Sequence, residues 1–163
     1  MISIWRRGLM LALILGGALI LQQTLVRWIA FDAVRPDLTL IALTFVALRY
    51  GSIAGLYSGL ILGLVQDVYA VEILGANALA KSLVGYGLGF FEEKVVKVMP
   101  ATRVLLLGLA FGLHDAVFHL ACGIGGAGFF GAMFRFSLPS AVYTLLLGAL
   151  VFYLVAGLRS REA

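Results

Sequence analysis

Residues 51–67 decide how this chain folds, and they read GSIAGLYSGLILGLVQD. Four glycines recur in this stretch at intervals of four residues: Gly51, Gly55, Gly59 and Gly63. Because an α-helix has 3.6 residues per turn, these glycines fall along one side of a helix and leave a flat stripe of bare backbone. Inside a bilayer, small residues let two helices approach closely and gain dispersion contacts. The glycine stripe therefore predicts a membrane helix packed tightly against another helix.

Two kinds of partner helix fit the glycine stripe. The first is a neighbouring helix of the same bundle, and the second is a transmembrane helix of another protein. Gly85 with Gly89, and Gly108 with Gly112, repeat the four-residue spacing more weakly. The sequence leaves both partners open.

The composition indicates lipid as the surrounding medium. Of the 163 residues, 63% are hydrophobic and only 12% are charged, whereas a soluble domain is about half apolar and about a quarter charged. The mean hydropathy is +1.08. The net charge of +4 does not indicate nucleic-acid binding, because the basic residues lie singly or in pairs at the ends of apolar runs. A single cysteine, Cys122, excludes an intrachain disulfide.

We expect an all-α polytopic membrane protein, a compact bundle of about six transmembrane helices in one domain over residues 1–163. The apolar runs place these helices at residues 8–27, 37–50, 51–72, 74–91, 102–122 and 137–158. A helix rises about 1.5 Å per residue, so the long first and last runs suffice to cross about 30 Å of hydrocarbon. The second run is short, and five crossings remain the alternative if it is re-entrant. The Gly-rich residues 123–128 predict a loop.

The basic residues predict that both termini are cytoplasmic. With six crossings and the N-terminus inside, eight basic residues lie on the cytoplasmic side and three outside. The cytoplasmic eight are Arg6, Arg7, Arg49, Lys94, Lys97, Arg103, Arg159 and Arg161, and the outer three are Arg27, Arg35 and Arg135. This asymmetry follows the positive-inside rule of bacterial membrane proteins.

Ionisable residues gather in what this topology makes the outer half of the bundle. They are Asp37, Asp67, Lys81, Asp115 and His119. A charge at the bilayer centre costs about 2.5–3.5 kcal/mol, so such groups normally pair inside the protein. We expect one polar cluster that opens outward. In one interpretation Lys81 pairs with Asp67 or Asp115 and fixes helix register; in the other, the cluster is a solute pocket or a partner-contact surface.

Arg35, Pro36 and Asp37 also admit a local interpretation. Proline suits the first turn of a helix, and a carboxylate there meets the positive end of the helix dipole. The three residues are therefore expected to open the second helix.

Metal binding and catalysis find little support in the sequence. Asp115, His119 and Cys122 share one helical face at i, i+4 and i+7, but one helix rarely supplies three zinc ligands. The chain has no Gly-x-Ser-x-Gly or phosphate-binding loop, and no His-Glu-x-x-His or Gly-x-Gly-Asp motif of intramembrane proteases. We expect neither an enzyme nor a cofactor.

The motif residues of the chain resemble those of the bacterial rod shape-determining protein MreD family. The resemblance rests on Arg35-Pro36-Asp37-Leu38, on the glycine stripe with Gly63-Leu64 and Asp67, and on Gly75 and Asn77. It implies a non-enzymatic inner-membrane scaffold of the cell-elongation machinery. Such proteins bind MreC and through it connect MreB filaments to the polymerase RodA and its penicillin-binding transpeptidase.

The same family is similar in fold to the membrane-embedded substrate-binding S components of vitamin transporters. S components hold their ligand in an outward-facing polar pocket. The resemblance therefore implies an alternative function, a solute-binding subunit of a transporter that uses the outer polar cluster.

Overall fold

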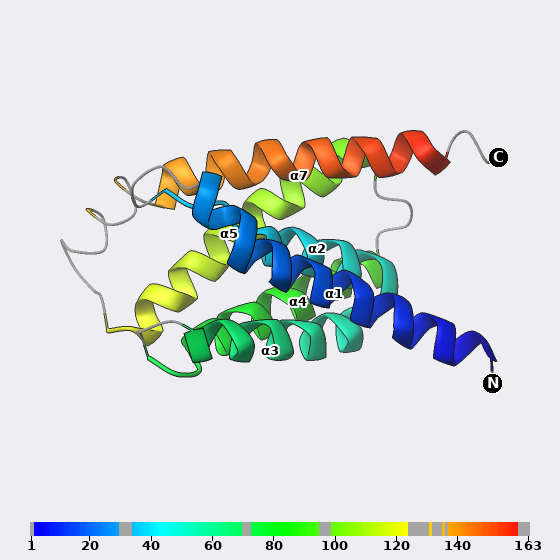
Figure 1. The fold of residues 1–163 in the computed structure, drawn as a ribbon, viewed down its shortest axis with the longest axis horizontal. Coiled ribbons are helices and arrows are strands. Elements are labelled where there is room, and N and C mark those ends of the chain that lie inside the picture. Colours follow the sequence, from blue (N-terminus) through cyan, green and yellow to red (C-terminus); the bar gives the residue numbers. More distant parts are fainter. Residues whose placement is uncertain are drawn as a thin grey trace.

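The computed structural model describes residues 2–29, 34–69, 73–94, 99–123, 131, 135 and 137–159. Within these residues the chain forms six long helices (Figure 1): α1 (Ile2–Ile29), α2 (Leu38–Tyr50), α3 (Ser52–Tyr69), α4 (Ala76–Lys94), α5 (Pro100–Ala121) and α7 (Leu138–Arg159). The ends of these helices lie within six residues of the expected ranges, and the largest difference is the start of α1 at Ile2. Most of the loop expected at residues 123–128 lies outside the described residues.

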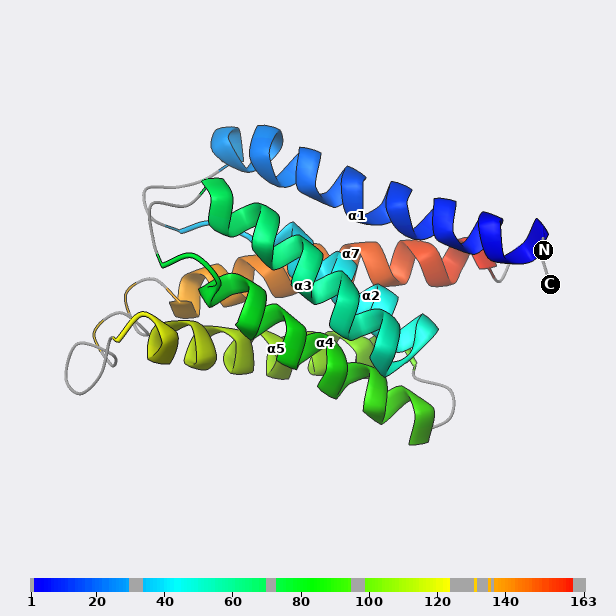
Figure 2. The same ribbon diagram turned by 90° about the horizontal axis from the view of Figure 1, so that it is seen from below.

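Successive helices run in opposite directions, so the bundle has two distinct ends (Figures 1 and 2). The start of α1 and the end of α7 lie at one end, shown on the right of Figure 1. The end of α1 and the starts of α2, α4 and α7 lie at the other. The first and last described residues, Ile2 and Arg159, therefore lie at the same end of the bundle.

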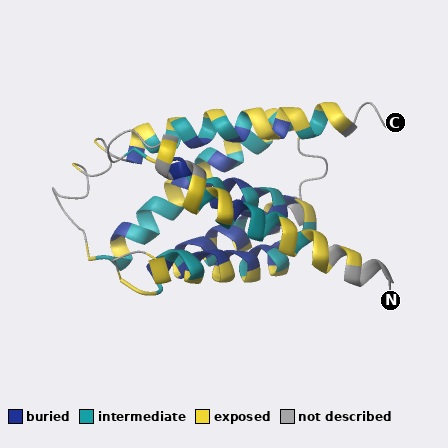
Figure 3. Cartoon of the chain, in the orientation of Figure 1, coloured by how far each residue is buried: buried dark blue, intermediate teal, exposed yellow. Residues whose placement is uncertain are grey.

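Helix α2 is short and central. Eight of its 13 residues are buried: Thr39, Leu40, Ile41, Leu43, Thr44, Val46, Ala47 and Leu48. Figure 3 shows α2 and the facing sides of α3 and α4 mostly buried, whereas α1 and α7 carry many exposed residues. A helix that is apolar on all sides belongs inside a bundle, which explains why so short a segment is stable here.

Both ends of α2 are set by local chemistry. Asp37 is the N-cap, and its carboxylate accepts a hydrogen bond from the Leu40 amide at 2.9 Å. Pro36 therefore precedes the helix, and the expectation that it occupies the first helical turn was wrong. At the other end Gly51 has a φ of 86°, a conformation that favours glycine. Its amide donates to the Ala47 carbonyl at 3.0 Å, and α3 begins at the next residue.

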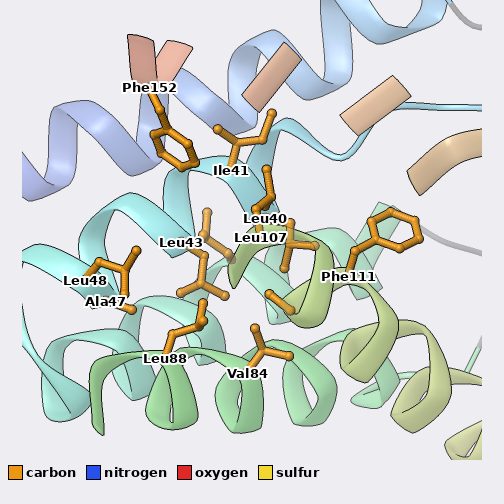
Figure 4. Close-up of a cluster of buried hydrophobic side chains, with 12 residues drawn as sticks. Leu40, Ile41, Leu43, Ala47, Leu48, Val84, Leu88, Leu107, Phe111 and Phe152 are labelled. Atoms are coloured by element: carbon orange, nitrogen blue, oxygen red, sulfur yellow. The ribbon is translucent and has the colours of Figure 1, made fainter. Parts of the chain in front are cut away.

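The hydrophobic core joins α2 to four other helices, and α3 contributes Leu62 to it (Figure 4). Leu40 and Leu43 from α2 lie in one cluster with Val84 from α4, Leu107 from α5 and Phe152 from α7. Leu40, Leu43, Leu107 and Phe152 are fully buried. Dispersion between closely packed side chains is the main attraction here, because lipid is as apolar as the side chains themselves.

The helices identify a membrane protein by length and composition. Three described helices are long and apolar enough to cross a bilayer: α3, α5 and residues Leu138–Leu158 of α7. Residues Gly8–Thr24 of α1 and all of α2 form shorter apolar helices. At about 1.5 Å per residue, α2 is about 20 Å long, less than the hydrocarbon thickness of about 30 Å.

Candidate functional site

Three glycines of the stripe, Gly55, Gly59 and Gly63, lie on α3 and pack directly against the backbone of α4. Gly51 instead caps α2, so the expectation that all four glycines share one helix was wrong. A Cβ atom at Gly59 would lie 2.5 Å from the carbonyl carbon of Lys81 and 2.8 Å from the amide nitrogen of Ser82. A Cβ at Gly63 would lie 2.5 Å from the carbonyl oxygen of Asn77. Real Cβ atoms do not approach so closely, so the two helices fit together only because these positions lack side chains.

Further along the same interface, two glycines of α4 face the backbone of α3 in the same way. A Cβ at Gly85 would lie 2.6 Å from the carbonyl carbon of Gly55, and one at Gly89 would lie 2.5 Å from the Cα of Ser52. Of the two partners considered for the stripe, the structure contains the helix of the same bundle. A transmembrane helix of another protein would have to displace α4 to reach it.

The ionisable residues near this interface form a buried ion pair that the sequence did not predict. The Lys81 Nζ atom lies 2.6 Å from Oδ2 of Asp37. The Lys81 side chain is fully buried, and that of Asp37 is 17% exposed. The expected pairing of Lys81 with Asp67 or Asp115 was therefore wrong.

His114 of α5 is the third member of this buried group. Its Nε2 lies 3.4 Å from the Lys81 Nζ, and its ring stacks on Phe118 at a centroid distance of 6.0 Å. An ammonium group only donates hydrogen bonds, so Nε2 is the atom placed to accept from Lys81. The Lys81 Nζ therefore lies between a carboxylate and an imidazole nitrogen.

Asp67 instead caps the start of α4. Its Oδ2 accepts from the amides of Gly75 and Ala78, both at 3.0 Å, and its Oδ1 accepts from the Asn77 amide at 3.1 Å. The Asn77 side chain adds a bond of 3.0 Å to Oδ1. The helix dipole places partial positive charge at these amides, which suits a buried carboxylate. Both oxygens of Asp67 are thus occupied.

Asp115 contacts the histidine one turn further along α5. The His119 Nδ1 lies 2.8 Å from the Asp115 carbonyl oxygen and 3.5 Å from its carboxylate oxygen Oδ2. No group of three or more potential metal-ligating side chains occurs in the described part of the chain. The direct contacts of Lys81, Asp67 and Asp115 thus form three sets, and the rings of His114, Phe118 and His119 link the set around Lys81 to the set around Asp115.

Three polar side chains that were not among the predicted site residues hold residues 35–38, which we call the junction segment. Gln22 of α1 donates from Nε2 to the Pro36 carbonyl at 3.1 Å and accepts from the Leu38 amide at 2.7 Å. From α7, Ser140 Oγ accepts from the Arg35 amide at 3.2 Å. Thr144 Oγ1 accepts from the Asp37 amide at 3.0 Å.

Two features of the sequence indicate that these side chains bond to other helices. Gln22 interrupts an apolar helix, and Ser140 and Thr144 share one face of α7 at a spacing of four residues. Polar side chains inside membrane helices generally bond across to other helices. The targets here are backbone atoms of an irregular segment, which no side-chain pattern reveals.

The chemistry of the site is structural. Carboxylates, amides and hydroxyls of the described residues bond to one another, and the fully buried cation is balanced by a carboxylate. Side chains of α1 and α7 bind the amides of residues 35, 37 and 38 and the carbonyl of residue 36. These contacts connect all six described helices, and none of these groups is poised as a nucleophile beside a base.

The comparison with known proteins agrees with these motifs. No curated protein and no solved structure matches the chain. A family model does match, over residues 3–160, and it describes the rod shape-determining protein MreD. The match covers nearly all of the 163 residues, including the junction segment, the glycine stripe and Lys81. The chain therefore belongs to the rod shape-determining protein MreD family.

Proposed function

We propose that this protein is a non-enzymatic scaffold of the cell-elongation machinery in the bacterial inner membrane. In this role it binds MreC and through it links MreB filaments to RodA and its penicillin-binding transpeptidase. The family match over residues 3–160 carries the proposal, because the family has a role in determining rod shape. The basic residues favour an orientation with both termini in the cytoplasm.

The packing of the glycine stripe changes where MreC is expected to bind. Since α4 covers the stripe, the transmembrane helix of MreC must use a face that the bundle leaves open. Exposed apolar side chains on α1, α5 and α7 offer such faces, for example Leu13, Leu109 and Leu146, which are 67%, 63% and 66% exposed. We propose that MreC binds one of these three helices, because the described residues of α3 and α4 are buried to a greater extent than those of α1, α5 and α7.

Site-specific photocrosslinking in living cells tests this assignment. A photoreactive amino acid is placed at Leu13, Leu109 or Leu146 in a rod-shaped bacterium that depends on this protein. We expect at least one of the three positions to capture MreC, whereas the fully buried Leu43 captures nothing. Normal rod shape after depletion, together with no MreC adduct at any exposed position, would show that the protein is not this scaffold.

The alternative, a solute-binding subunit of a transporter, loses its main support. It depended on Asp67, Lys81 and Asp115 forming one pocket, but each of them is engaged in a different set of contacts. A small ligand retained by the purified protein in native mass spectrometry, with cell shape unaffected by deletion, would favour it again.

A further inference from the structure

We propose that the junction segment couples the C-terminal end of α1 to the N-terminal end of α7, so that loosening either helix loosens the other. The proposal concerns a conformational device within the bundle and does not depend on MreC binding. Its basis is that both helices are attached to the same four residues, 35–38.

The attachments of the two helices alternate along this short backbone. Ser140 of α7 binds the amide of residue 35, Gln22 of α1 binds the carbonyl of residue 36, Thr144 of α7 binds the amide of residue 37, and Gln22 binds the amide of residue 38. Each group bonded to one helix is therefore adjacent in sequence to a group bonded to the other helix. The two helices therefore share one support.

The support itself is stiff and anchored in the core. Pro36 is fully buried, and its ring fixes φ near −65°. The Asp37 side chain fastens the segment to α2 through Leu40 and to α4 through Lys81. A stiff segment transmits a displacement from one side to the other, whereas a flexible one would absorb it.

Polar bonds matter for α1 and α7 because the two helices bury few side chains. Among the described side chains of α1, only Ala18 and Val26 are buried, and in α7 Thr144 and Phe152 are fully buried. A backbone amide left without a partner in an apolar surrounding is costly. When Gln22 or Thr144 is lost, the freed amide favours a rearrangement of the whole segment.

Hydrogen exchange on the purified protein in detergent tests the coupling. In Gln22→Leu we expect amide exchange to accelerate about threefold in residues 141–147 of α7. This is the effect of weakening one hydrogen bond between membrane helices, here the bond from the Asp37 amide to Thr144. In Thr144→Val we expect the same change in residues 19–26 of α1. Each variant thus affects a helix that carries no substitution.

Leu88→Ala is the matched control, because it removes a buried side chain from α4 that is not part of the junction. We expect it to lower the Tm without accelerating exchange selectively in residues 19–26 and 141–147. If Leu88→Ala accelerates those residues as much as Gln22→Leu does, the effect is general destabilisation and the proposal fails.

The thermal stabilities supply a second, independent readout. We expect the Tm loss of the double variant Gln22→Leu/Thr144→Val to be smaller than the sum of the two single losses, since the first substitution already releases the segment. Should Thr144→Val fail to fold, Ser140→Ala takes its place and removes only the acceptor for the Arg35 amide. Additive Tm losses, with faster exchange confined to the substituted helix, would overturn the coupling.

Discussion

Lys81→Met tests the buried ion pair most directly. Methionine keeps most of the volume of the lysine stem but removes the ammonium that lies 2.6 Å from Asp37. Breaking a buried pair by removing one partner costs about 3–5 kcal/mol, because the remaining charge is stranded. Asp37 keeps its bonds from Thr39 and Leu40 and is 17% exposed. We therefore expect a loss near the lower limit, about 3 kcal/mol of unfolding free energy.

Reversible unfolding in mixed micelles, titrated with a denaturing detergent, measures this loss. The exposed Arg49→Met is the control, and we expect it to stay within about 0.5 kcal/mol of the wild type, as surface substitutions do. Adding Asp37→Asn to Lys81→Met should cost little more, because the stranded charge disappears. The double-mutant cycle of Lys81→Met and Asp37→Asn is expected to give an interaction free energy of about 1–3 kcal/mol. A Lys81→Met variant as stable as Arg49→Met would refute the reasoning.

Three further substitutions test the interface, the cap and the core by the same measurement. Gly59→Ala should destabilise by about 1–3 kcal/mol, because its Cβ would overlap the backbone of α4; Gly16→Ala, with nothing within 4 Å of its Cβ, should stabilise by about 0.5–1 kcal/mol. If the two changes have equal effects, the close packing of α3 on α4 is wrong. Asp67→Ala should cost about 1–2 kcal/mol and raise amide exchange in the first turn of α4; unchanged exchange there would exclude the cap. Phe152→Ala should cost about 3–5 kcal/mol because it empties a fully buried site, whereas Tyr153→Ala, at a position 56% exposed, should cost much less.

The close contact of α3 with α4 has a consequence for partner binding. Gly59 lies beside the backbone of Lys81, the residue that reaches Asp37. A bulky residue at Gly59 would therefore displace the α4 backbone inside the bundle. A loss of MreC binding in such a variant would not show that MreC binds at Gly59.

The local sequence determined three properties of this protein: its apolar surface, the positions of its helices and the side of α3 that packs closely. Apolar runs and helical periodicity act over a few residues, so they gave the helix ranges and the side of α3 that carries bare backbone. The need to neutralise a buried lysine also followed from the sequence, since any charge in an apolar interior requires a partner. The motifs at residues 35–38 and 51–67 were sufficient to indicate the family, which the match over residues 3–160 shows.

Only the tertiary structure decided which groups meet. The predicted polar cluster contained three aspartates, and the sequence separation of 44 residues between Lys81 and Asp37 gave no reason to favour Asp37. The choice depends on depth within the bundle. Asp67 lies beside the first amides of α4, about a turn and a half before Lys81 along that helix, and those amides already occupy both of its oxygens. The short α2 begins at the level of Lys81, so the carboxylate that caps α2 is also the one that neutralises the lysine.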